Sequence, residues 1–287
     1  MAEKEEVATT VEKDPARLEV VKKIQELEKQ GKFDQDVEND PPAKVLMPDQ
    51  VDYLNKKLSS KILTKFYNHA VTNFFEKQIK AGALVIDEPE GLENLKEVKS
   101  VGVVFTCNHI NPIDSYIIHK SIKPVMKKEL TYRVIREGNY TGFDGFLGQV
   151  FKHCNTLPLS SNKETMKLFI KAVETLLKKN KKILIYPEQA MWWNYRKPRP
   201  LKEGAFHFAV KNNVPVLPMF ITMTETDKIG QDGFPVLKYK LNIGKAIYKN
   251  PDLNNRDNME YMAKQNFETW KEIYEKAYNQ ELEYVKE

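Results

Sequence analysis

The sequence of 287 residues contains only two cysteines, Cys107 and Cys154, and no C-x2-C pair. A disulfide framework is therefore not expected to stabilise the fold, and a reducing cytoplasm is the expected compartment. The spacing of these cysteines and the neighbouring histidines matches no usual zinc site, so we expect no bound metal.

Long apolar runs are also missing. No stretch approaches the roughly 18–20 consecutive apolar residues that a helix needs to span a bilayer. Residues 1–6 are mostly charged and lack the apolar segment of a secretory signal, so we expect no export signal there. The sequence also lacks a Gly-x-Ser-x-Gly motif, a P-loop and a dinucleotide-binding fingerprint, which argues against the enzyme classes that use them.

Charge is unevenly distributed along the chain. The formal net charge is +5, but residues 1–50 carry 8 Lys and Arg against 13 Asp and Glu, which leaves +10 on the rest. A basic body favours anionic partners such as phosphorylated substrates, coenzyme phosphates, an acidic carrier protein or anionic lipid. No nucleic-acid-binding motif is present, and acidic residues interrupt the basic ones, so nucleic acid is not an expected partner.

Composition divides the chain into an extension and one main domain. Residues 1–16 are charged and poor in large apolar groups, 17–30 have a helical pattern, and 34–48 indicates an irregular linker. We therefore expect a charged, partly disordered and helical N-terminal extension over 1–50, and a domain over 51–287.

Beyond residue 80, short apolar runs alternate with amphipathic segments. The expected strands are 83–87, 101–106, 130–136, 156–159, 183–186, 214–221 and 236–243. The expected helices are 112–122, 142–152, a helix opened by the capping box Ser161-x-x-Glu164, 203–212 and a C-terminal helix from about 257. Strands that alternate with helices predict an α/β fold with a mostly parallel central sheet flanked by helices.

The strongest helical signal lies at 53–80. Apolar residues recur there at helical spacing, namely Leu63, Phe66, Tyr67, Ala70, Val71, Phe74, Phe75 and Ile79. We favour packing of this stripe on the core. The alternative is a helix that lies in a membrane interface, because the stripe is aromatic and lysines occupy the other face.

The residues most indicative of chemistry follow the expected strand 101–106. His109 lies on the loop to the next helix, with Asn111 as the expected cap and Pro112 at the first helical position. One helical turn would bring the Asp114 carboxylate to one ring nitrogen of His109 and leave the other nitrogen free as a base. Taken singly, Asp114 could simply satisfy a helix N-terminus, and His109 could be a structural histidine.

Other candidates lie at the same expected edge of the sheet. Glu188 follows the strand 183–186 and is a candidate for positioning substrate. The loop 191–202 holds four cations and three aromatic residues, which suits a phosphate or an anionic lipid surface; structural Arg–Trp packing is the alternative. Arg133 and Arg136 are the strongest candidates of a second basic cluster, and Cys107 is a weaker candidate for a nucleophile.

Four of these blocks occur in an order that resembles the 1-acylglycerol-3-phosphate acyltransferase (PlsC-like) family. The resemblance covers about 85–221 and rests on Asn108-His109-x4-Asp114, Asn155 to Ser161, Tyr186-Pro187-Glu188 and Val214-Pro215-Val216-Leu217-Pro218. It implies a glycerolipid acyltransferase-like fold that moves a fatty acyl group from acyl-coenzyme A or acyl-carrier protein to a hydroxyl of a lysophospholipid. By the resemblance, His109 deprotonates the acceptor, Asp114 holds its tautomer, and no cofactor beyond the acyl donor is needed.

Two blocks depart from the family pattern. The third block usually continues as Glu-Gly-Thr-Arg, whereas this chain has Glu188-Gln189-Ala190-Met191. The second block usually holds an arginine, where this chain has Ser160 and Ser161. Both phosphate-binding arginines are thus missing or displaced. The predicted substrate-binding set is therefore Asn108, Glu188, Arg196, Lys197, Arg199, Arg133 and Arg136.

These expectations describe a transferase of phospholipid biosynthesis or remodelling, bound peripherally to the anionic inner face of the cell membrane. The default acceptor is 1-acylglycerol-3-phosphate. Three alternatives stay open: the same chemistry on an uncharged alcohol or another lysolipid, a thioesterase, and a non-catalytic protein that binds acyl lipids or acyl carriers.

Overall fold

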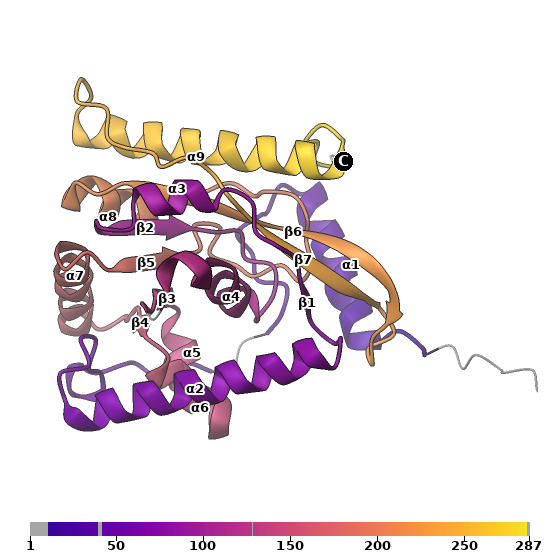
Figure 1. The fold of residues 1–287 in the computed structure, drawn as a ribbon, viewed down its shortest axis with the longest axis horizontal. Coiled ribbons are helices and arrows are strands. Elements are labelled where there is room, and N and C mark those ends of the chain that lie inside the picture. Colours follow the sequence, from indigo (N-terminus) through magenta and orange to yellow (C-terminus); the bar gives the residue numbers. More distant parts are fainter. Residues whose placement is uncertain (1–10, 40–41, 128, 286–287) are drawn as a thin grey trace, which may run out of the picture.

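The computed structural model describes residues 11–39, 42–127 and 129–285. Residues 1–10, part of the segment expected to be disordered, lie outside these ranges. In the described residues one sheet of seven strands is covered by helices on both faces (Figure 1). The strands are β1 (Val85–Ile86), β2 (Val103–Thr106), β3 (Tyr132–Ile135), β4 (Thr156–Pro158), β5 (Lys182–Ile185), β6 (Val216–Ile229) and β7 (Pro235–Ile243).

The helices follow the predicted alternation, with added short elements. They are α1 (Pro15–Lys29), α2 (Leu58–Lys80), α3 (Leu92–Glu97), α4 (Asp114–Met126), α5 (Glu137–Thr141), α6 (Gly145–His153), α7 (Lys163–Lys178), α8 (Gly204–Asn212) and α9 (Asn255–Tyr278), with a 3-10 turn, η1, at Pro48–Gln50. Asn162 caps α7 by accepting from the backbone N–H groups of Glu164 and Thr165. The predicted cap, Ser161, was therefore wrong by one residue.

The strand order is β1-β7-β6-β2-β5-β3-β4. β2 lies between β5 and β6 and is parallel to both, and β3 is parallel to β4 and β5. β6 and β7 form an antiparallel hairpin, to which β1 adds in parallel with β7. The prediction of a mostly parallel α/β sheet flanked by helices is confirmed, since each crossover along β2 to β6 carries helix.

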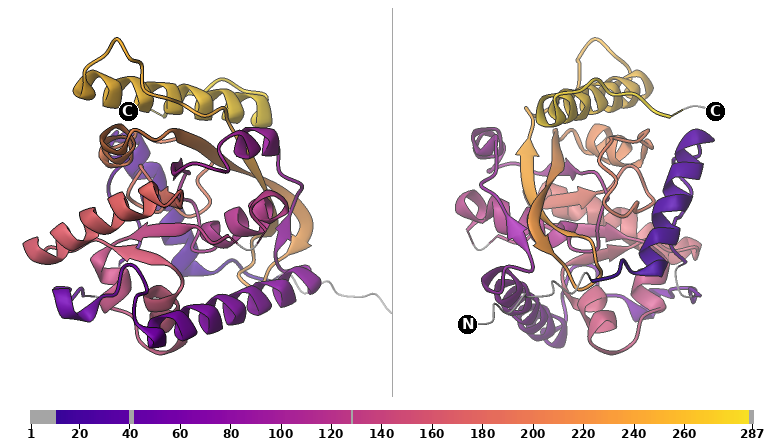
Figure 2. Two further views of the ribbon diagram at one scale, coloured as in Figure 1. Left: turned by 60° about the vertical axis from the view of Figure 1, so that its left-hand side comes forward. Right: turned by 90° about the vertical axis from the view of Figure 1, so that its right-hand side faces the viewer.

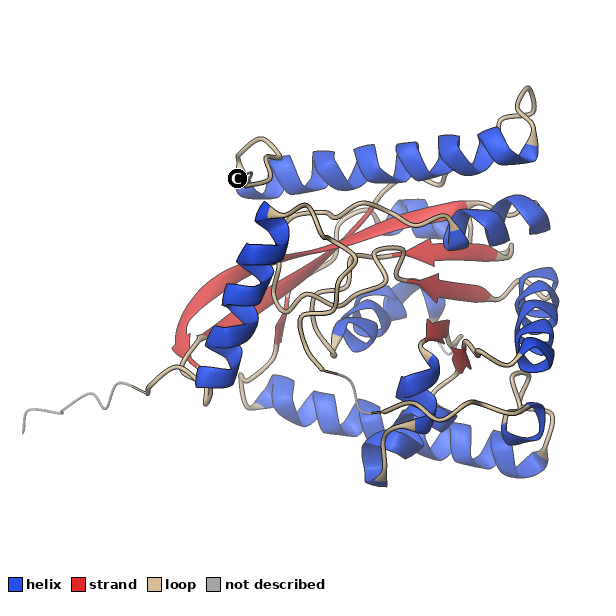
Figure 3. Cartoon of the chain, turned by 180° about the vertical axis from the view of Figure 1, so that it is seen from behind, coloured by secondary structure: helices blue, strands red, loops and turns tan. Residues whose placement is uncertain are grey.

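Figure 3 shows helices on both sides of the sheet. Side chains of the central strands enter two cores, one on each face. In β2, Val103 and Phe105 join the core that contains α4, and Val104 joins the core that contains α7 and α8. These strands are buried on both faces, which explains their continuous apolar sequence. His109 follows β2 at the carboxyl edge of the sheet, where loops from several strands meet.

Helix α2 leaves several apolar side chains exposed, some of them outside the predicted stripe. Leu58 is 72% exposed, Ile62 60%, Phe66 59% and Phe74 52%, whereas Thr64 is the one buried residue in this fully described helix. The favoured prediction of core packing was therefore wrong for Leu63, Phe66 and Phe74. It holds for the end of the helix, where Phe75 and Ile79 contact the core. Of the helices in the described part of the chain, none has the length and apolarity that crossing a bilayer demands.

The N-terminal segment 15–38 folds back onto the main body. Helix α1 lies on the opposite side of the sheet from α4 (Figure 2). Ile24 of α1 and Val37 pack with Ala190 and Trp192, which belong to the loop after β5. The domain boundary near residue 50 stays a prediction. The N-terminal extension nevertheless packs on the loop after β5, which leaves the sheet at the same edge as His109.

Candidate active site

The imidazole of His109 is held by Asp114. Nδ1 lies 2.9 Å from Asp114 Oδ2, while no described residue hydrogen-bonds Nε2. The His109 side chain is 23% exposed and that of Asp114 only 1%. The predicted contact is therefore present, and its geometry leaves Nε2 available to accept a proton from a bound molecule.

The loop between β2 and α4 wraps around the same carboxylate. Asp114 Oδ2 also accepts the backbone N–H groups of Ile110 at 2.9 Å and Asn111 at 3.1 Å. Helix α4 begins at Asp114, and its cap position is Ile113 without a side-chain cap. The predicted cap at Asn111 and helix start at Pro112 were thus wrong, because the carboxylate organises this turn.

Burial raises the pKa of the Asp114 carboxyl, and the hydrogen bonds from His109, Asn111 and Ile110 oppose that shift. These bonds converge on Oδ2, so the charge is concentrated beside Nδ1. A buried carboxylate in this position stabilises an imidazolium that forms when Nε2 takes a proton.

The ring of Tyr186 stacks on one face of the His109 imidazole. The two rings stack with centroids 4.1 Å apart and planes 15° apart, and the Tyr186 hydroxyl lies 3.0 Å from Ser115 Oγ. Burial raises the pKa of Tyr186 well above its usual value, so the phenol stays neutral. Sequence reasoning missed this contact, although Tyr186 opens the Tyr-Pro-Glu motif directly after β5.

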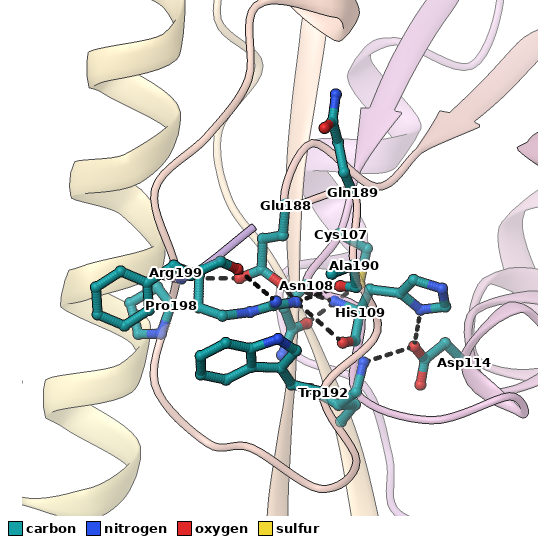
Figure 4. A network of polar contacts seen from close by, with 12 residues as sticks. Cys107, Asn108, His109, Asp114, Glu188, Gln189, Ala190, Trp192, Pro198 and Arg199 are labelled. Carbon is teal, nitrogen blue, oxygen red and sulfur yellow. Dashed lines mark hydrogen bonds and ion pairs between the residues drawn. The ribbon is translucent and has the colours of Figure 1, made fainter. Parts of the chain in front are cut away.

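Glu188 is buried within the network shown in Figure 4. Its Oε2 accepts the backbone N–H of His109 at 3.0 Å and Arg199 Nη2 at 2.8 Å, and its Oε1 accepts the Arg199 backbone N–H at 2.8 Å. The Glu188 carboxylate therefore joins the loop of His109 to Arg199, and each of these hydrogen bonds is made with a protein group.

Asn108 is also buried and continues the pairing of β2 with β6. Its Oδ1 accepts the backbone N–H of Ile221 at 2.8 Å, and its Nδ2 donates to the Ile221 carbonyl at 3.0 Å. Beyond the end of β2, the Asn108 side chain thus takes the place of the backbone hydrogen bonds that pair β2 with β6. These bonds fix the position of the chain directly before His109.

The three predicted cations of the loop after β5 each have an acidic partner. Arg196 lies 2.8 Å from Glu225, and Lys197 lies 2.6 Å from Glu28 of α1. Arg199 is 1% exposed and ion-paired with Glu188. Of the three, Arg196 is the most exposed, at 43% of its side chain.

The two strand arginines differ from each other. Arg136 pairs with Asp36 at 2.7 Å and reaches the Gln189 carbonyl at 3.4 Å. Arg133 donates to the Cys154 carbonyl at 2.6 Å, and no described carboxylate lies within ion-pair distance of it. Burial lowers the pKa of Arg133. On the sheet Arg133 is paired with Leu184, two residues before Tyr186. A half-buried cation at this position, without an acidic partner among the described residues, is a candidate for binding an anion.

The cysteine alternatives lose support. Cys107 is fully buried in the core, and burial together with Asp114 and Glu188 raises the pKa of its thiol well above the usual value. A buried thiol of raised pKa is a poor nucleophile. Among the described residues, no group of three or more His, Cys, Asp or Glu side chains could hold a metal ion.

Comparisons with known proteins find acyltransferases. The family model described as Acyltransferase matches residues 88–222. An uncharacterized acyltransferase of Schizosaccharomyces pombe is 31% identical over 138 residues, which is 46% of this chain and 45% of that protein. The chain therefore spans less than half the length of this relative.

A solved structure shares the fold. The crystal structure of the 1-acyl-sn-glycerophosphate (LPA) acyltransferase PlsC from Thermotoga maritima matches with a TM-score of 0.52 and 19% identity. The match covers 78% of this chain and 81% of that chain. At this level of identity the likeness establishes a common architecture.

Proposed function

We propose that this chain moves a fatty acyl group from acyl-coenzyme A or acyl-carrier protein to a hydroxyl of a lysophospholipid, because its residues 88–222 match the acyltransferase family model. The observation that supports this proposal best is the His109–Asp114 pair, with Nδ1 held at 2.9 Å and Nε2 available. The default acceptor is 1-acylglycerol-3-phosphate, in phospholipid biosynthesis or remodelling.

The proposed reaction is a direct transfer. His109 Nε2 takes the proton from the acceptor hydroxyl as its oxygen bonds to the thioester carbonyl carbon. The tetrahedral intermediate collapses when the C–S bond breaks, and the leaving thiolate takes the proton from the imidazolium. Asp114 stabilises the imidazolium between these steps. The buried thiol of Cys107 supports a route without a covalent acyl-enzyme.

We assign the acceptor phosphate to the side of the site that holds Arg133. Its guanidinium has no acidic partner among the described residues. Arg133 is paired on the sheet with Leu184, two residues before Tyr186, on which the His109 ring stacks. Arg136 borders the same edge through its contact with the Gln189 carbonyl. A phosphate would supply the missing counter-charge, and guanidinium groups bind phosphate in a bidentate way.

We also propose that the chain works peripherally on the cytoplasmic face of an anionic membrane. The exposed apolar side chains of α2 support this, namely Leu58, Ile62, Leu63, Phe66 and Phe74. The Tyr67–Phe146 ring contact joins α2 to α6, where Phe146 is 55% exposed. Exposed apolar groups beside lysines favour an interface with anionic lipid. Lysines of this helix stand at Lys61 and Lys65.

The decisive experiment measures acyl transfer by the full chain across lysolipids that differ in head group, with each thioester donor. His109→Ala should abolish product, whereas the matched control His207→Ala, an exposed histidine on α8, should not change it. Product only from acceptors without phosphate would discard the default acceptor and keep the chemistry. Free fatty acid without transfer would indicate a thioesterase. Acyl-chain binding without turnover, unaffected by His109→Ala, would indicate a binding protein.

A further inference from the structure

A buried ion pair holds the peptide groups of His109. The His109 N–H donates to Glu188 Oε2 at 3.0 Å, and the His109 carbonyl accepts from Arg199 Nη2 at 3.3 Å. Glu188 and Arg199 are themselves 2.8 Å apart, and each side chain is 1% exposed. Both backbone polar groups of the proposed base are therefore bonded to one ion pair (Figure 4), and the His109 carbonyl also accepts the Trp192 backbone N–H at 3.1 Å.

The guanidinium of Arg199 is bound from several directions by protein. Nη2 also donates to the Ala190 carbonyl at 2.5 Å, and Nη1 donates to the Phe33 carbonyl at 3.0 Å. The group lies 4.8 Å from the centroid of the Trp192 ring. Arg199 thus makes its bonds inside the protein, which differs from the exposed phosphate contact expected of it.

The N-terminal segment supplies part of this surrounding. Besides the Phe33 carbonyl, the Gln35 carbonyl accepts from Trp192 Nε1 at 2.8 Å. Asp34 pairs with Lys202 at 2.9 Å. Without the Phe33 carbonyl, an N–H group of Arg199 would be buried and unpaired, which is costly. Residues 33–35 lie outside the family match at 88–222.

We propose that Arg199 is a positioning residue for His109, and that the carbonyl groups of residues 33 and 35 complete its site. The N-terminal segment 15–38 is then part of the catalytic machinery. The inference rests on the proposed function in taking His109 as the base. The reaction requires Nε2 at a fixed place relative to the acceptor hydroxyl, and a displacement of about 1 Å can cost roughly 100-fold in rate.

Arg199→Ala in the full chain tests this role. We expect kcat to fall about 100-fold while the acceptor KM stays within about twofold, because a positioning residue does not touch the acceptor. Millimolar guanidinium should restore much of the lost kcat by refilling the site, and the same concentration of potassium chloride should not. The matched control, Arg256→Ala, removes an exposed arginine of α9 and should behave as the wild type. A raised KM with unchanged kcat, or no rescue of a folded variant, would overturn the proposal.

A second variant keeps the test independent of folding, since removing one partner of a buried ion pair can unfold a protein. Trp192→Phe retains an aromatic ring and the Glu188–Arg199 pair but loses the bond to the Gln35 carbonyl. We expect kcat to fall several-fold with unchanged KM. An unchanged kcat would reject the contribution of the Gln35 carbonyl.

An NMR readout separates the inference from the proposed reaction. The Nδ1 proton that His109 shares with Asp114 should give a downfield resonance in the wild type. It should disappear in Arg199→Ala and return with guanidinium. If it does so in a protein that makes no acylated product, the positioning role stands and the proposed function fails. A resonance that Arg199→Ala leaves in place would reject the positioning role.

Discussion

Asp114 Oδ2 hydrogen-bonds His109 Nδ1 at 2.9 Å and also accepts two backbone N–H groups of the loop that carries His109. One oxygen therefore both orients the ring and shapes its loop. The other oxygen, Oδ1, is buried and has no hydrogen-bond partner among the described residues. An isosteric substitution separates the charge of this group from its shape.

Asp114→Asn should leave the fold in place, because an amide oxygen can still accept the two backbone N–H groups. By analogy with the Ser-His-Asp triad, kcat should fall by about 10⁴, since the imidazolium loses its counter-charge and the tautomer is no longer fixed. Steady-state kinetics and circular dichroism measure the two effects. Asp252→Asn, an exposed position before α9, is the control. A variant that keeps a tenth of the wild-type kcat would contradict this role.

The sequence was informative where interactions are local. The contact between His109 and Asp114 spans five residues, and a strand followed by a helix start already brings them together. The central strands were equally predictable, because parallel strands buried on both faces are continuous apolar runs. The predicted end of β6 at 221 was wrong, since the strand continues to Ile229 in its antiparallel pairing with β7. Turn details were less predictable, because Asp114 accepts the backbone N–H groups of Ile110 and Asn111, whereas Asn111 accepts only that of Ile113, before the helix begins.

Long-range contacts explain what the sequence did not predict. Arg199 is fixed by the carbonyl of Phe33, 166 residues away, and a backbone carbonyl has no sequence signature. The basic residues of the loop 191–202 therefore suggested an anion-binding site. In the structure Arg196, Lys197 and Arg199 are paired instead with acidic side chains of the protein. For α2, the helical periodicity predicted which residues lie on one face of the helix. It could not show whether that face contacts protein or solvent.

Arg133→Met should raise the KM of a phosphate-bearing acceptor at least about tenfold, because a charge-assisted hydrogen bond contributes roughly 1.5–3 kcal/mol. The melting temperature should not fall, since the variant removes a half-buried cation that has no acidic partner among the described residues. Kinetics with phosphate-bearing and phosphate-free lysolipids, with Arg256→Met as control, measure this. Equal KM values for wild type and variant would remove Arg133 from the phosphate site.

His119 should make the fold less stable in mild acid. Burial, with contributions from Arg133, Lys123 and Lys120, lowers the pKa of His119 to about 4, from 6.5. Between these values the unfolded chain binds more protons than the folded one, so stability rises with pH and is lost as pH falls through this window. The full difference is up to about 3 kcal/mol.

Urea unfolding at a series of pH values across this window measures the effect. His119→Gln should flatten the acid limb of the curve, because it removes the titrating group. His69→Gln, which changes an exposed histidine of α2, is the matched control. An acid limb that His119→Gln leaves unchanged would show that other groups cause it.

The double variant Ile62→Ser with Phe66→Ser should weaken binding to anionic liposomes. Burying each side chain in the interface contributes roughly 1.5–3 kcal/mol, so the partition coefficient should drop at least about tenfold. Sedimentation with liposomes at low salt measures it. Leu168→Ser, at a 43% exposed leucine of α7, controls for a general loss of surface apolarity. Equal sedimentation of double variant and wild type would reject α2 as the membrane contact.

Gln189→Gly should stabilise the chain. Gln189 has φ +66°, in the left-handed region that costs a non-glycine residue of order 1–3 kcal/mol. Its side chain is exposed, and the related family usually has glycine at this point of the third block. Glycine removes the strain but adds entropy to the unfolded state, so the net gain should be about 1 kcal/mol or less. Thermal unfolding measures the gain in stability.

Asn213→Gly, at φ +51° after α8, is the matched control and should gain less, because asparagine tolerates this region. A destabilised Gln189→Gly would mean that the glutamine side chain itself holds the loop beside Glu188.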